Sequence, residues 1–250
     1  MRDKNIIVKS ILRSYAKATY LTWVYDWPVN EFKEDWTKMA ISWSWWKDSC
    51  YCLHDALKRN IDVKMLFVVV DSKTKMSLTW PYNVDLLKKQ SDSIWIPLYK
   101  VNISKDPISS LENFFYLLNK NWIDSLGFWY FIPEWQRELI QELAYKHWLS
   151  IFEPNLWVNQ EKRLLDLFEI WIESIVVWIN QRNMDIKYLW KKLNNIFYDY
   201  LKSKKQYTQF CWENWDFQTF VLDAPFFKNS IKLDDYYRFQ IGNYIINYYF

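Results

Sequence analysis

Residues 41–49 read Ile41-Ser42-Trp43-Ser44-Trp45-Trp46-Lys47-Asp48-Ser49, and they join two segments of different character. The residues at 38–42 predict a short β-strand, and those at 49–59 predict a helix. The first backbone N–H groups of a helix have no partner within it, so a strand–loop–helix junction is a frequent binding site for phosphate. The segment therefore predicts a nucleotide site, although three indole side chains stand in the loop.

Strand and helix signals alternate from this loop to about residue 179. Strands are predicted at 63–70, 96–101, 123–128 and 173–179, and helices at 84–91, 108–119, 134–147 and 160–169. The apolar run at 63–70 is typical of a parallel strand that is buried on both faces. The alternation predicts an α/β fold with a Rossmann-like parallel sheet and helices on both of its faces.

The pattern changes after residue 180. A polar helical stretch at 187–203 is followed by strand-like segments, which predicts a smaller C-terminal α+β portion. We expect three segments: an N-terminal extension at 1–37, a nucleotide-binding domain at 38–120 and a substrate-side domain at 121–250. The status of the extension stays open, because Met39 is an alternative start.

Glycine and tryptophan occur in unusual numbers. Average usage of about 7% would give about 18 glycines in a chain of this length, whereas the chain has 2 glycines and 18 tryptophans in 250 residues. Asp26-Trp27 and Asn214-Trp215 would be strong turn signals with glycine, and Trp148 follows a predicted helix where a left-handed glycine is expected. We therefore hypothesise that UGA encodes glycine in this gene and was translated as tryptophan. A genuinely tryptophan-rich protein is the alternative.

Charge and cysteine content give weaker expectations. The formal net charge of +3 does not indicate a basic face for nucleic acid. Cys50, Cys52 and Cys211 form neither a CxxC pair nor a disulfide framework, which favours a reducing, cytoplasmic setting. No stretch approaches 18 apolar residues, so we expect neither a membrane span nor a signal peptide.

With glycine in place of tryptophan, residues 41–49 read I-S-G-S-G-G-K-D-S. This resembles the S-G-G-K-D-S signature of the PP-loop ATP pyrophosphatases of the HUP superfamily. The resemblance implies that ATP phosphates are bound by Ser42, Trp43, Ser44, Trp45, Trp46, Lys47, Asp48 and Ser49. Glycines let backbone N–H groups form an anion nest, Lys47 supplies a charge for the departing pyrophosphate, and Asp48 is expected to hold Mg²⁺. Read literally, the indoles would fill this nest, and the alternative is an aromatic loop on which bases or sugars stack.

Residues 211–227 carry a second motif. With glycine restored they read C-G-E-N-G-D-F-Q-T-F-V-L-D-A-P-F-F, which is similar to the G-E-x-G-E-[FY]-x-T-F-V-x-D-[AG]-P-[LF]-F block of the diphthine-ammonia ligase family. The resemblance implies that Glu213 and Asp216 are catalytic and that Asn214, Phe217 and Thr219 lie on the substrate side. Asp216 stands where the family usually has glutamate. Glu213 and Asp216 are expected to converge on a metal ion, ammonia or a substrate amine, although spacing alone favours a solvated β-hairpin.

A shorter match begins the helix predicted at 134–147. Glu134-Trp135-Gln136-Arg137 resembles the S-E-Y-Q-R element of the same family, so Glu134, Gln136 and Arg137 are expected on the substrate side. The guanidinium of Arg137 would suit a phosphate or a carboxylate. A surface arginine in the first turns of a helix is an equally acceptable interpretation.

Together, these motifs imply an ATP-dependent amidoligase resembling diphthine-ammonia ligase. Members of that family adenylate a substrate carboxylate with loss of pyrophosphate, and free ammonia then displaces AMP to give an amide. The expected partners are ATP, Mg²⁺, ammonium and a carboxylate on a protein or small molecule, without a membrane or nucleic acid. Two alternatives stay open: a PP-loop enzyme that adenylates a tRNA base, and a non-enzymatic binding protein if the tryptophans are real.

Overall fold

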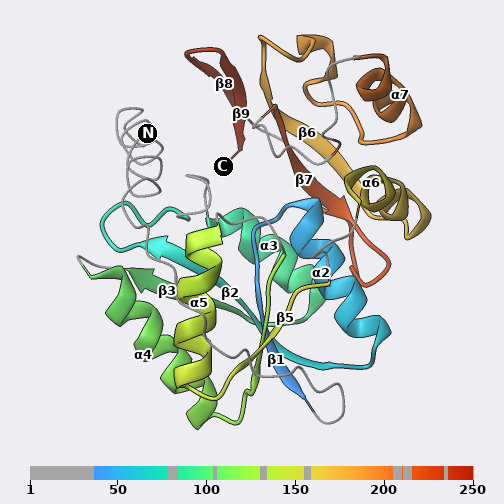
Figure 1. The fold of residues 1–250 in the computed structure, drawn as a ribbon. Coiled ribbons are helices and arrows are strands. Elements are labelled where there is room, and N and C mark those ends of the chain that lie inside the picture. Colours follow the sequence, from blue (N-terminus) through green and yellow to red (C-terminus); the bar gives the residue numbers. More distant parts are fainter. Residues whose placement is uncertain are drawn as a thin grey trace.

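The computed structural model describes residues 37–77, 84–103, 106–129, 134–154, 159–204, 210, 216–233 and 236–249. Figure 1 shows two sheets, one in the lower part of the view and the other above it. Apart from Thr37, the expected extension at 1–37 lies outside the described residues. Residues 211–215 of the second motif, which include Glu213 and Asn214, lie outside them as well.

The first sheet is entirely parallel and has the strand order β3-β2-β1-β4-β5. Its strands are β1 (Lys38–Ser42), β2 (Asp62–Asp71), β3 (Leu98–Ile103), β4 (Ser125–Gly127) and β5 (Ser150–Phe152). The chain builds outward from β1 in one direction through β2 and β3, and in the other through β4 and β5. In Rossmann-like sheets the carboxyl ends of the strands at such a reversal form the usual ligand crevice. The predicted α/β class is confirmed.

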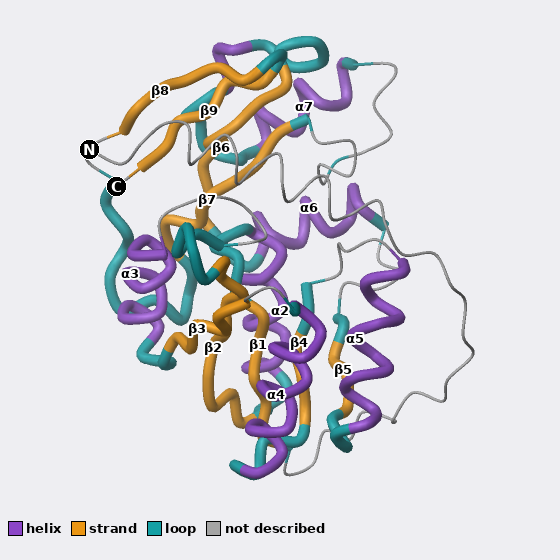
Figure 2. Tube along the Cα trace, turned by 90° about the vertical axis from the view of Figure 1, so that its left-hand side faces the viewer, coloured by secondary structure: helices purple, strands orange, loops and turns teal. Residues whose placement is uncertain are grey.

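Helices cover both faces of this sheet, as predicted (Figure 2). They are α2 (Lys47–Lys58), α3 (Val84–Ile94), α4 (Pro107–Lys120) and α5 (Glu134–Lys146). Successive residues of a strand point to opposite faces, and β1 shows this directly. Ala40 belongs to the core under α4 and α5, whereas Met39 and Ile41 belong to the core under α2 and α3.

The second sheet is antiparallel, with the order β7-β6-β9-β8. Its part of the chain contains α6 (Gln160–Glu169), β6 (Glu173–Asn180), a 3₁₀ turn (Ile186–Tyr188), α7 (Asn195–Ser203), β7 (Phe217–Asp223), β8 (Tyr236–Ile241) and β9 (Tyr244–Tyr249). The strand predicted at 173–179 is present as β6, but the expectation that it continues the parallel alternation is wrong. An apolar run fits a buried central strand of either kind, so the run alone does not identify its partners.

Strand β5 is not predicted by the sequence, because its three residues are too few for a periodic signal. Strands β4 and β5 both follow residue 120, so the parallel sheet extends into the segment expected to form the substrate side. We propose that the boundary between the two parts lies between β5 and α6. The polar stretch at 187–203 is helical only in the 3₁₀ turn and in α7.

Tryptophan occupies most of the left-handed backbone positions. Eight non-glycine residues in the described ranges have positive φ, and six of them are tryptophan, with φ from 53° to 73°: Trp45, Trp95, Trp122, Trp148, Trp171 and Trp190. A left-handed conformation brings Cβ too close to the backbone, whereas glycine adopts it without that cost. This backbone geometry supports the hypothesis that glycine belongs at these positions.

Three of these tryptophans end helices in the same way. Trp122, Trp148 and Trp171 follow α4, α5 and α6, and each donates its N–H to the carbonyl three residues back. The residue after each donates to the carbonyl five residues back, and all six hydrogen bonds measure 2.9 to 3.2 Å. This is the Schellman motif, in which the left-handed residue is usually glycine. The three indoles are 80%, 78% and 82% exposed, so they extend into solvent and leave the core undisturbed.

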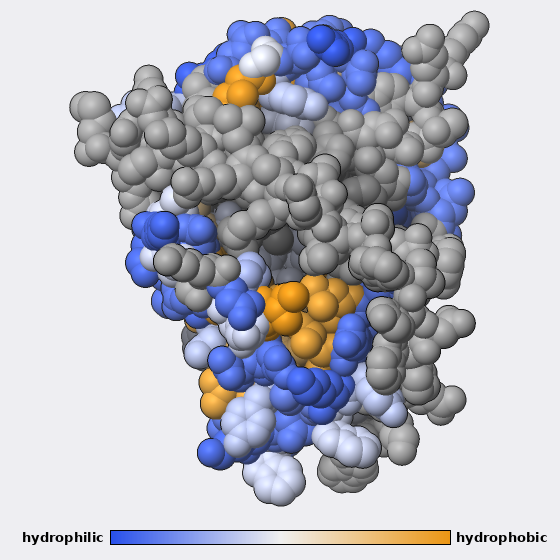
Figure 3. All heavy atoms as spheres, turned by 60° about the vertical axis from the view of Figure 1, so that its left-hand side comes forward, coloured by the Kyte–Doolittle hydropathy of each residue, from blue (hydrophilic) through white to orange (hydrophobic). Residues whose placement is uncertain are grey.

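The surface gives no single dominant feature on the face shown in Figure 3. Most of the coloured residues on that face are hydrophilic; the largest apolar area lies near the middle of the view, and a smaller one lies near the top. Among the helices of the described ranges, none combines the length and the apolar character needed to cross a bilayer.

Candidate functional site

The loop at residues 43–46 connects the carboxyl end of β1 to α2, beside the point where the strand order reverses. The N–H of Trp43 still pairs with β2, donating to the carbonyl of Phe67 at 2.8 Å. Helix α2 then begins at Lys47, two residues earlier than predicted, so Lys47 and Asp48 lie in its first turn. The loop thus places a helix N-terminus, with its positive dipole end, at the ligand crevice of the sheet.

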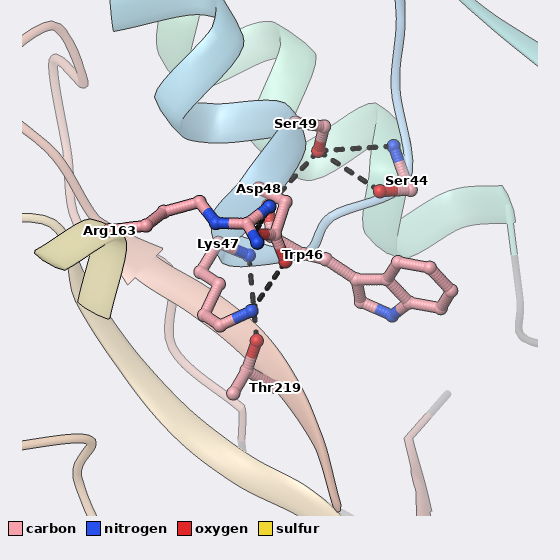
Figure 4. Close-up of polar contacts among 7 residues, drawn as sticks. All are labelled: Ser44, Trp46, Lys47, Asp48, Ser49, Arg163 and Thr219. Carbon is pink, nitrogen blue, oxygen red and sulfur yellow. Dashed lines mark hydrogen bonds and ion pairs between the residues drawn. The ribbon is translucent and has the colours of Figure 1, made fainter. Parts of the chain in front are cut away.

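Two serine side chains fix the shape of the loop (Figure 4). Ser49 Oγ accepts hydrogen bonds from the N–H of Ser44 at 3.3 Å and from its hydroxyl at 3.1 Å. The same Oγ donates to the carbonyl of Trp46 at 3.0 Å. Ser44 and Ser49 are both buried, and Ser42 is the last residue of β1. The serines predicted to bind phosphate are therefore gathered at one end of β1.

Three charged side chains meet at the first turn of α2. Lys47 Nζ lies 2.5 Å from Asp48 Oδ2, and Arg163 Nη1, reaching across from α6, lies 3.8 Å from Asp48 Oδ1. All three side chains are at most 3% exposed. Charged side chains are almost never buried unless they are paired, so burial of all three marks a specialised site. Two cations beside a helix N-terminus are chemically suited to a phosphate group.

The indoles of Trp43, Trp45 and Trp46 are buried in the protein, at 1% to 2% exposure. Trp46 packs edge-on against Trp129, which follows β4, with ring centroids 4.8 Å apart. Trp45 lies against Phe220 of β7 at 6.1 Å. The rings therefore occupy space between the loop, the end of β4 and β7. This agrees with the expectation that the literal sequence fills its own phosphate loop.

Trp43 differs from the two tryptophans that follow it. Its indole Nε1 donates to Gln90 Oε1 at 3.0 Å. Trp45 has a φ of 53°, whereas Trp43 is not among the described residues with positive φ and Trp46 has a φ of −76°, so the left-handed backbone singles out Trp45. The sequence suggests glycine at positions 43, 45 and 46 alike, but the structure gives position 43 a partner that suits tryptophan.

Strand β7 brings the second motif to the loop. The N–H of Val221 donates to the carbonyl of Trp45 at 3.0 Å, and the N–H of Lys47 donates to Thr219 Oγ1 at 3.5 Å. Lys47 and Thr219 are 172 residues apart in sequence. Thr219, expected on the substrate side, therefore lies directly against the loop expected to bind ATP.

Two other described residues of the second motif lie in different surroundings. Asp216 is buried and accepts a hydrogen bond from Asn183 Nδ2 at 2.6 Å, while Phe217 packs in the core against Phe197. The convergence of Glu213 with Asp216 stays a prediction, because Glu213 lies outside the described residues. Within the residues that the structure places, no three His, Cys, Asp or Glu side chains cluster as a metal site. Mg²⁺ commonly uses one or two carboxylates together with substrate phosphates. The expected role of Asp48 in holding Mg²⁺ stays a prediction, and in the structure its carboxylate faces Lys47 and Arg163.

Arg137 of the third motif makes its polar contact at the end of β5. Its Nε lies 3.2 and 3.1 Å from the two carboxylate oxygens of Glu153, and Nη2 lies 3.1 Å from Oε2. Burial raises the pKa of Glu153, and the guanidinium partly offsets that rise. Glu134 begins α5, but the side chains of Glu134 and Gln136 lie outside the described set. A substrate-side role for these three residues stays a prediction.

Two cysteines follow the loop on α2. Cys50 and Cys52 are completely buried, and burial raises the pKa of both thiols well above the usual value. The thiolate is the reactive form of cysteine. Their surroundings therefore fit a role in packing.

Sequence reasoning missed Arg163 and Gln90, both of which reach the loop from distant helices. Arg163 belongs to no motif, but it lies among the buried residues of the amphipathic helix α6 with Leu164 and Leu167. A positive charge on the apolar side of such a helix was the available signal. No comparable signal marks Gln90, because its role depends on contacts across the fold.

The fold and the site define a class. A Rossmann-like parallel sheet, with a strand–loop–helix junction where its strand order reverses, is an architecture typical of nucleotide-binding α/β enzymes.

Comparison with protein families then identifies the family. Residues 37–144 match the diphthamide synthase N-terminal domain, and residues 159–248 match the diphthamide synthase C-terminal domain. The two matches cover most of the chain, so the protein belongs to the diphthamide synthase family, whose members use ATP. A search of curated proteins found no match.

Proposed function

We propose that the protein is an amidoligase that cleaves ATP to AMP and pyrophosphate, adenylates a substrate carboxylate and transfers ammonia to it. The observation that carries the proposal is the contact between the loop and β7, made by Val221 with Trp45 and by Lys47 with Thr219. This contact joins the ATP-binding motif to the motif that resembles the substrate side of diphthine-ammonia ligases.

In the proposed reaction, a carboxylate oxygen attacks the α-phosphorus of ATP, and the bond from that phosphorus to the bridging oxygen of pyrophosphate breaks. Ammonia then attacks the acyl carbon, loses a proton, and displaces AMP. Lys47 and Arg163 neutralise the departing pyrophosphate, while Ser44 and Ser49 bind phosphate oxygens. Asp48 holds Mg²⁺, which supplies further charge neutralisation on the phosphates.

The proposal requires a loop without the buried indoles. We use the term glycine-decoded form for the protein made with glycine at every position that the gene encodes by UGA. Glycine at position 45 removes the left-handed strain, and glycine at 45 and 46 frees the space between the loop, β4 and β7. The backbone N–H groups of residues 45 and 46 can then contribute to an anion nest.

The test is to identify the products of ATP made by the glycine-decoded form, in the presence of ammonium and candidate carboxylates. Equal amounts of AMP and pyrophosphate are expected, with release that depends on ammonium. Hydrolysis to ADP and phosphate would exclude the proposal. The protein with tryptophan at all 18 positions is the matched control and is expected to release neither product.

A further inference from the structure

We propose that Gln90 is a positioning residue that holds the phosphate loop against β7. The inference rests on the proposed function, because it concerns how the loop is shaped for ATP. Gln90 lies in α3, and its side chain is 0% exposed. Most buried amides find partners for both the donor and the acceptor, and the amide of Gln90 does so.

The amide of Gln90 contacts two elements besides its own. Its Nε2 donates to the carbonyl of Val221 at 2.8 Å and lies 3.5 Å from the carbonyl of Trp45. Its Oε1 accepts from the indole N–H of Trp43 at 3.0 Å. These partners define the orientation of the amide, because only its nitrogen can donate to carbonyls and only its oxygen can accept from an indole. One side chain therefore joins both ends of the loop to β7.

The carbonyl of residue 45 is the point on which these contacts act. It accepts from the N–H of Val221 at 3.0 Å and faces Gln90 Nε2. A trans peptide directs its C=O and its N–H to opposite sides, so a carbonyl held toward β7 turns the N–H of residue 46 away from β7. That N–H stands immediately before α2, among the donors that a phosphate at a helix N-terminus would use. Gln90 therefore acts through the loop backbone.

The same contact bears on the identity of residue 43. Glycine at 43 would remove the donor to Gln90 Oε1, and a buried acceptor that loses its donor is costly. We infer that residue 43 is tryptophan in the natural protein and that residues 45 and 46 are glycine. The glycine-decoded form should therefore keep the Trp43–Gln90 hydrogen bond.

Ser93 lies one turn further along α3 and provides a matched control. Its Oγ accepts from the N–H of Asn229 at 3.1 Å, and its carbonyl accepts from the N–H of Lys228 at 2.8 Å. Ser93 thus joins α3 to the segment after β7, as Gln90 joins α3 to β7 itself. Its described contacts do not include the loop. Replacing Ser93 therefore weakens the packing of α3 against the segment after β7 and leaves the contacts of the loop unchanged.

The experiment measures the dissociation constant of ATP by calorimetry for the glycine-decoded form and for its Gln90→Leu, Trp43→Phe and Ser93→Ala variants. Gln90→Leu is expected to weaken ATP binding about tenfold, the order expected for loss of one or two hydrogen bonds. Trp43→Phe, which removes only the indole donor, is expected to weaken it about twofold to threefold. Ser93→Ala is expected to leave it within about twofold of the parent.

Unchanged ATP affinity in Gln90→Leu, or an equal loss in Ser93→Ala, would overturn the inference. Should Gln90→Leu fail to fold, Trp43→Phe decides: unchanged affinity in that variant overturns the inference. A glycine-decoded parent that binds no ATP would instead refute the proposed function, and this inference with it. A parent that binds ATP with the same affinity as Gln90→Leu refutes this inference alone.

Discussion

The ends of α4, α5 and α6 and the phosphate loop contain the same residue in the same backbone conformation, with different consequences. At the helix ends, Trp122, Trp148 and Trp171 have positive φ, and their indoles extend into solvent. In the loop, Trp45 has positive φ as well, but its indole is buried between structural elements. A fold tolerates a large side chain at a left-handed position where solvent receives it. In the loop the indole is buried, and it would take the space that we propose for the phosphates of ATP.

The largest expected effect separates the two regions directly. In the protein with tryptophan at all 18 positions, the pair Trp45→Gly and Trp46→Gly is expected to create ATP binding that calorimetry can detect. The pair Trp122→Gly and Trp148→Gly restores two helix ends and is expected to create none. If both double variants bound ATP equally well, or if neither bound it, the indoles of the loop would not differ from those of the helix ends in their effect on ATP binding.

A second prediction compares an arginine beside the loop with an arginine far from it. In the glycine-decoded form, Arg163→Met is expected to raise the KM for ATP about tenfold to a hundredfold, because a guanidinium–phosphate contact is charge-assisted. Arg238→Met is the matched control, since Arg238 Nε bonds to Asn247 at 3.0 Å within the second sheet. That control is expected to stay within about twofold of the parent. A similar change in both variants would mean that Arg163 does not act at the ATP site.

Replacing tryptophan with glycine at the helix ends should change the stability of the protein and not its binding of ATP. Trp122→Gly, Trp148→Gly and Trp171→Gly are each expected to raise the free energy of unfolding by about 1 kcal/mol, because a left-handed residue with a Cβ costs roughly that amount. The sites are on separate helices, so the three gains should add. Urea unfolding with linear extrapolation measures them. A loss of stability on introducing glycine would show that these positions suit tryptophan.

The smallest expected effect concerns the end of α2, where Asn60 holds the equivalent position. Asn60 has a φ of 57° and makes the same pair of hydrogen bonds as the tryptophans. Asparagine tolerates the left-handed region better than other non-glycine residues. Asn60→Gly is therefore expected to change the free energy of unfolding by only a few tenths of a kcal/mol. A gain as large as that of Trp122→Gly would mean that conformational strain does not explain the helix ends.

Local patterns account for what the sequence predicts well. The apolar runs of β1 and β2 and the periodic pattern of α6 lie in single segments, so their positions are correct within a few residues. The loop is recognised because Ser44, Lys47, Asp48 and Ser49 lie within six residues of each other, interrupted only by Trp45 and Trp46. Its place between a strand and a helix was predicted correctly, whereas its role in binding phosphate stays a prediction.

Contacts between distant segments account for what the sequence does not predict. Arg163 and Gln90 approach the loop only because α6 and α3 pack beside it, and no local signal encodes that packing. The antiparallel pairing of β6 depends on strands β7 and β9, which follow it in the chain. The hydrogen bond from the indole of Trp43 to Gln90 likewise depends on the packing of α3 beside the loop.

Peptide mass spectrometry of the natural protein tests the central claim most directly. Cleavage after Lys38 and Lys47 releases residues 39–47, which contain positions 43, 45 and 46 in one peptide. Glycine at 45 and 46 with tryptophan at 43 is the predicted result, and it would leave the phosphate loop open for ATP. Tryptophan at 45 and 46 would contradict the account, because the natural protein would then carry a loop that its own indoles fill.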